Sequence, residues 1–90
     1  MRHASPASLD ALEPLLGEIR KVGGPIVERK RGIWYLRSRG FLHFHEDPAG
    51  FFADLQTGDD FERFRVSTAA ERRAFLARLR RTLRDVDRSA

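Results

Sequence analysis

The chain has 90 residues and no cysteine, is 41% hydrophobic and 33% charged, and carries a net charge of +4. These values indicate one small domain with a modest core, and they exclude a second domain, disulfide bonds and a thiolate metal site. No apolar run is long enough to cross a membrane, and residues 1–8 lack the apolar region of a signal peptide. We therefore expect a cytoplasmic protein with no membrane contact.

The first part of the chain predicts an amphipathic helix. Apolar residues recur at helical spacing from Leu9 to Val22. Ser8 or Asp10 could cap its start, and the later start is favoured because Pro14 is tolerated only in or near the first turn. Gly23–Gly24–Pro25 predicts its end.

Between residues 26 and 66 the hydrophobic period changes to two, which indicates strands with one buried face. Short turns, each with glycine or proline, separate the apolar segments. Because such connections leave no room for crossover helices, the strands should pair antiparallel as a meander. The predicted strands are Ile26–Glu28, Ile33–Arg37, Phe41–His45, Phe51–Gln56 and Phe61–Val66.

The last segment predicts a second amphipathic helix. Thr68 and Glu71 have the spacing of a capping box, and apolar residues from Phe75 to Val86 then follow one helical face. The opposite face carries an arginine stripe, made of Arg73, Arg80, Arg81, Arg84 and Arg88.

Together these segments predict an α+β fold: a helix, an antiparallel meander of four or five strands and a C-terminal helix, with both helices on one sheet face. We expect a single domain over residues 9–87. Residues 1–8 should be a flexible N-terminus, so His3 receives no role, and residues 88–90 a frayed C-terminus.

Two histidines form the main candidate for chemistry. His43 and His45 alternate with apolar residues, so both imidazoles project from one sheet face, roughly 6.5–7 Å apart at Cα, and can reach one ion. Asp54 on the next strand could complete a set of two histidines and one carboxylate, with Glu46 or Asp47 as substitutes. Such a set suits a divalent transition metal that activates water or polarises a carbonyl in a hydrolase or lyase. The alternative is that the histidines are solvated or stack on aromatic rings, with no cofactor at all.

The sheet face without helices is a candidate binding surface. If the helices cover the face with Trp34, the other face presents four rings: Tyr35, Phe41, His43 and His45. A protein partner or a second copy of the chain could cover it, so the favoured function is a non-enzymatic binding or assembly module, and the chain is a candidate homodimer. The competing explanation is a sheet curled enough to shelter these rings.

The arginine stripe suggests a different partner. Arg73, Arg80, Arg81 and Arg84 could neutralise phosphates and bind nucleic acid weakly, without sequence preference and with strong salt dependence. The same stripe could dock on an acidic protein surface or stay in water as a solvated helix face.

Two stretches resemble a known family. The run from Trp34 to Asp47, with its His43-Phe44-His45-Glu46-Asp47 segment, followed by Ala53-Asp54-Leu55, is similar to a strand pair of the small bacterial and fungal luciferase-domain proteins. The segment Phe61–Ser67 and the helix after it look like the last strand and helix of that family. The resemblance implies a small α+β domain in which four residues matter, namely His43, His45, Asp47 and Asp54.

Overall fold

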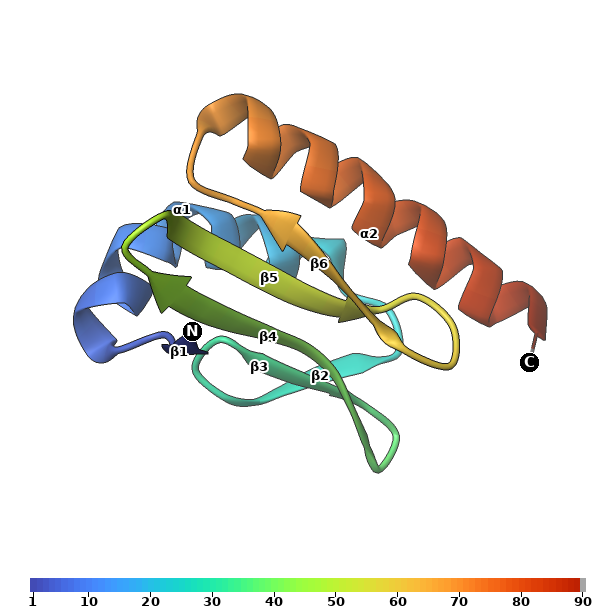
Figure 1. The fold of residues 1–90 in the computed structure, drawn as a ribbon. Coiled ribbons are helices and arrows are strands. Elements are labelled where there is room, and N and C mark those ends of the chain that lie inside the picture. Colours follow the sequence, from blue (N-terminus) through green and yellow to red (C-terminus); the bar gives the residue numbers. More distant parts are fainter. Residues whose placement is uncertain (90) are drawn as a thin grey trace.

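An antiparallel sheet of consecutive strands forms the centre of the computed structural model, which describes residues 1–89 (Figure 1). The elements in chain order are β1 (Arg2–His3), α1 (Pro6–Val22), β2 (Ile26–Lys30), β3 (Ile33–Leu36), β4 (Arg39–Asp47), β5 (Gly50–Gln56), β6 (Phe61–Arg65) and α2 (Ala69–Ser89). The strand order is β2-β3-β4-β5-β6, and β1 pairs with β4. The predicted α+β class and antiparallel meander are confirmed.

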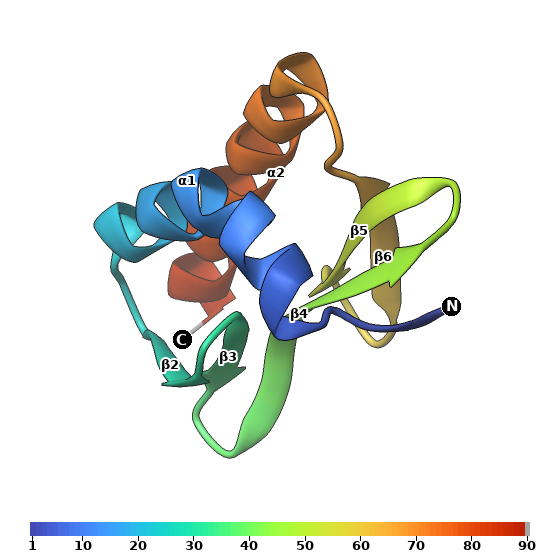
Figure 2. The ribbon, with the colours of Figure 1, turned by 90° about the vertical axis from the view of Figure 1, so that its left-hand side faces the viewer.

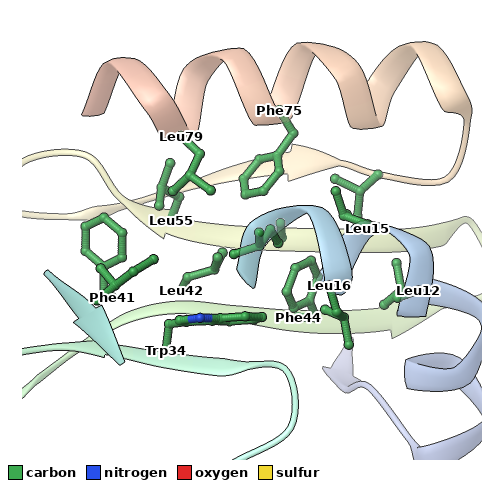
Figure 3. Close-up of a cluster of buried hydrophobic side chains, with 14 of the residues drawn as sticks. Leu12, Leu15, Leu16, Trp34, Phe41, Leu42, Phe44, Leu55, Phe75 and Leu79 are labelled. Atoms are coloured by element: carbon green, nitrogen blue, oxygen red, sulfur yellow. The ribbon is translucent and has the colours of Figure 1, made fainter. Parts of the chain in front are cut away.

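Both helices lie on the same side of the sheet (Figures 1 and 2). Between them and the strands lies the core, in which Leu16 of α1 and Phe75 of α2 pack with Trp34, Leu42 and Phe44 of the sheet (Figure 3). The other sheet face carries no helix, and we call it the open face. Neither α1 nor α2 combines the length and the apolar character needed to cross a bilayer, within the described residues.

Phe41 does not lie on the open face, so that prediction is wrong. Trp34 pairs with Leu42 and Tyr35 pairs with Gly40, which leaves Phe41 as an extra residue of β4 without a partner on β3. This bulge interrupts the alternation of side chains, because two residues of β4 oppose one of β3. Phe41 and Leu42 are therefore both in the core, 1% and 0% exposed.

Helix α1 starts earlier than predicted. Ser5 is its N-cap and accepts a hydrogen bond from the Ser8 N–H, with Pro6 in the first turn. Pro14 lies inside the helix. There it removes one intrahelical hydrogen bond at a cost of about 3 kcal/mol. The helix continues because Leu15 and Leu16 directly after it are buried in the core, and burying each such side chain stabilises the fold by about 1.5–3 kcal/mol.

The ends of the chain also differ from expectation. Arg2 pairs with Glu46 and His3 with His45, so β1 extends the sheet along the edge of β4. This edge is free because β3 has four residues and β4 has nine. At the other end α2 runs to Ser89, and Ala90 lies outside the described residues.

Candidate metal centre

Three neighbouring strands place polar side chains in one row across the open face. His43 of β4 pairs with Asp54 of β5, which pairs with Arg63 of β6. His45 follows two residues after His43 and projects from the same face. The structure therefore brings together the two histidines and the aspartate that the sequence singled out.

The side chains of this row form a chain of contacts. Arg63 donates two hydrogen bonds to the Asp54 carboxylate, from Nε and Nη2, each 2.8 Å long. Asp54 Oδ2 lies 3.2 Å from His45 Nε2, and His45 Nε2 lies 2.9 Å from His43 Nδ1. His45 Nδ1 is buried and makes no hydrogen bond of good geometry with residues 1–89, although a backbone hydrogen bond with Arg2 contributes to the pKa of this ring by raising it.

A third imidazole, for which the sequence predicts no role, joins the pair. The His3 ring stacks on the His45 ring with centroids 4.7 Å apart, and it lies 6.0 Å from the His43 ring. One ring nitrogen from each of the three histidines lies within 4.8 Å of the other two. No local sequence signal pointed to His3, because only the pairing of β1 with β4 brings it here.

Burial keeps the two strand histidines neutral. It lowers the pKa of His43, and the nearby His45 lowers it further, against the opposing effect of Asp54. Burial likewise lowers the pKa of His45, and the negative charge of Asp54 only partly offsets this. At neutral pH both imidazoles therefore keep a lone pair for a metal ion or a proton.

Asp54 stays ionised, but its carboxylate already accepts hydrogen bonds from Arg63. Burial alone would raise the pKa of this carboxyl group, yet the hydrogen bonds and charge of Arg63 outweigh burial and lower it. The suggested substitutes are engaged elsewhere. Glu46 accepts a hydrogen bond from the Ser5 N–H at the start of α1, and Asp47 accepts one from the Ala49 N–H in the β4–β5 turn. The arrangement thus favours a set of three imidazoles as metal ligands over the predicted set of two imidazoles and one carboxylate.

Aromatic rings border the imidazoles, as the alternative interpretation expected. The Phe61 ring lies 4.9 Å from the His43 ring and is 46% exposed. On the next row the Arg65 guanidinium lies 5.2 Å from the centre of the Phe52 ring. The imidazoles therefore have apolar and cationic neighbours on the open face.

The other predicted binding residues lie apart from the imidazoles. Tyr35 is half-buried under the guanidinium of Arg29, 5.1 Å from its ring centre, and makes no ring contact with a histidine among residues 1–89. The α2 residues Arg73, Arg80, Arg81 and Arg84 are exposed and form no ion pair within that range. They belong to the helix layer, so the arginine stripe and the open face are separate surfaces.

No protein-family model, curated protein or solved structure matches this chain. The resemblance to luciferase-domain proteins, and the importance that it implies for His43, His45, Asp47 and Asp54, stay predictions. The candidate site is therefore argued from its geometry and chemistry alone.

Proposed function

We propose that the protein is a binding module that holds a divalent transition metal on its open face through His3, His43 and His45. The observation that carries this proposal is the convergence of three ring nitrogens within 4.8 Å of one another. Two metal–nitrogen bonds of about 2.0–2.1 Å at a tetrahedral angle place their nitrogens about 3.4 Å apart. The rings need to move by about 1 Å, and the His3 ring is exposed, so it has room to do so.

The ligand set favours particular metals. Neutral imidazoles suit zinc, cobalt, nickel and copper better than magnesium or calcium, which prefer oxygen ligands. Three protein ligands leave the fourth position of a tetrahedral ion open to water or to a partner. Asp54 Oδ2 lies against His45 Nε2, the nitrogen that also faces His43, and Arg63 fixes that carboxylate from the other side.

The same geometry supports the enzyme alternative less well. A metal-assisted hydrolase or lyase needs a group that accepts a proton from water or substrate. Asp54 has a lowered pKa and already accepts two hydrogen bonds from Arg63, so it is a weak base. A metal-binding module, with the open position free for a partner molecule or a second copy of the chain, accounts for these residues better.

Cobalt titration tests the proposal. Metal-free protein at pH 7.5 should develop the visible absorption bands of tetrahedral cobalt, and one equivalent of zinc should remove them. The melting temperature should rise with metal concentration, since an ion at 100 times its Kd stabilises the folded state by about 2.7 kcal/mol. His43→Gln and His3→Gln should abolish both effects, whereas the control Arg2→Gln, which changes the neighbouring residue of β1, should retain them.

Two outcomes would refute the metal-binding module. One is the absence of cobalt bands and of any thermal stabilisation by cobalt or zinc. The other is unchanged binding in His43→Gln, with circular dichroism showing that this variant is folded, because an ion held without His43 would belong to a different site.

A further inference from the structure

A second candidate site lies at the opposite end of β4 from the β4–β5 turn. There the β3–β4 hairpin, the β5–β6 turn and the C-terminal part of α2 together line a cavity of about 420 Å³. This volume lies in the range of small-molecule sites, about 300–1,000 Å³. The cavity shares no residue with the three imidazoles, so it is independent of the proposed metal site.

The lining of this cavity divides into two parts. Leu36 and Val86 supply apolar surface, and Arg37 and Arg39 line the cavity from the hairpin. Both arginines are exposed and form no ion pair with residues 1–89, whereas the guanidinium groups of Arg20 and Arg31 each bridge two carboxylates.

The opposite wall carries one acidic group. Asp85 of α2 lines the cavity, and its carboxylate lies 3.9 Å from a guanidinium nitrogen of Arg88. The cavity lining therefore holds two arginines, Arg37 and Arg39, and one carboxylate, Asp85, whose charge Arg88 partly neutralises. The net charge of the lining is positive. That balance favours an anionic over a cationic ligand.

Arg37 is the first of the two residues in the β3–β4 turn, a position where tight hairpin turns require a positive φ. Its φ is +59°, the left-handed region, and within residues 1–89 it is the one residue other than glycine with a positive φ. Glycine or asparagine would adopt this conformation at lower cost. Strained backbone of this kind concentrates at ligand-binding sites, where a particular side chain outweighs the cost.

We propose that this cavity binds a small monocarboxylate with an apolar body, such as a medium-chain fatty acid. The carboxylate lies between Arg37 and Arg39, since guanidinium groups bind carboxylates through paired hydrogen bonds. The apolar body covers Leu36 and Val86.

Binding of hexanoate, octanoate and decanoate, measured by amide chemical shifts in the presence of EDTA, tests this proposal. Affinity should rise about fourfold with each added methylene, because each buries apolar area. The shifts should concentrate at residues 36–41, 56–58 and 82–86. The double variant Arg37→Gln/Arg39→Gln should bind octanoate at least tenfold more weakly. The control Arg80→Gln/Arg84→Gln loses the same charge outside the cavity and should bind as the unchanged protein does.

Three results would overturn the carboxylate site. Equal weakening in both double variants would mean attraction to net charge alone. Octanol binding as tightly as octanoate would remove the role of the two guanidinium groups. Shifts that are absent from the three cavity segments would place the ligand elsewhere. Because EDTA excludes metal, none of these results bears on the imidazole site.

Discussion

Replacing Phe41 by alanine should destabilise the protein strongly. Phe41 is 1% exposed and packs in the core beside Leu42, although strict alternation along the strand had assigned it to the open face. Truncation of a buried phenylalanine costs about 3–5 kcal/mol, the transfer of the ring plus the cavity that it leaves. A 90-residue domain has a free energy of unfolding of about 5–14 kcal/mol. Phe41→Ala should therefore remove a large share of it and lower the Tm by at least about 12 °C.

Urea unfolding followed by circular dichroism measures this loss, and Tyr35→Ala is the matched control. Tyr35 is a half-buried ring on the neighbouring strand, and its truncation removes the cation–π contact with Arg29, worth about 0.5–1 kcal/mol at an exposed site. The cost should be larger for Phe41→Ala, because Phe41 is fully buried and Tyr35 only half-buried. An equal loss of free energy of unfolding in the two variants, or a larger loss in Tyr35→Ala, would contradict the bulge and would indicate that Phe41 lies on the open face.

Two further predictions concern pH and backbone strain. The pKa values of His43 and His45 are lowered from about 6.5, so the two histidines take up protons on unfolding when the pH is below 6.5. The contribution of the two histidines to stability is therefore complete above pH 6.5 and decreases as the pH falls. Urea unfolding at pH 7.5 and 5.5 should show this loss, and an equal loss in His43→Gln/His45→Gln would contradict it. Gly50→Ala should cost at least about 2 kcal/mol, because the new methyl group at φ +134° would overlap Ser67 Oγ, which accepts the Phe51 N–H. Gly17→Ala, where nothing lies within 4 Å, should be neutral or stabilising in the same assay, and a similar cost for both would refute the argument.

Local chemistry is what made the strands and the second helix predictable. At the start of α2 the Thr68 hydroxyl accepts the Glu71 N–H at 3.1 Å, and the Glu71 carboxylate accepts the Thr68 N–H at 3.0 Å. This capping box requires only residues three apart, so the sequence contains all of it. The hairpins are equally local, since each is defined by one short turn between two alternating segments.

Two local expectations gave way to tertiary packing. The preference against proline inside a helix placed the start of α1 near Asp10, but Pro14 lies in its interior because the leucines after it are buried. The alternation along β4 placed Phe41 beside the histidines, but a single extra residue in the pairing with β3 turned it inward. A bulge of this kind depends on the partner strand, so the spacing within β4 could not reveal it.

The position of His3 could not be predicted from the sequence, because it depends on the pairing of β1 with β4. The nine residues of β4 exceed the four of β3, and a backbone edge left without a partner is free to pair with another segment. Glu46 holds the chain before α1 at this edge by accepting the Ser5 N–H, and the Ala4 N–H donates to Phe44 O at 3.1 Å. These contacts join residues about forty apart and direct β1 along β4, which places His3 opposite His45. The third imidazole therefore follows from the contact of Glu46 with Ser5, the N-cap of α1, and an ion bound at this site would also hold the start of α1 against the sheet.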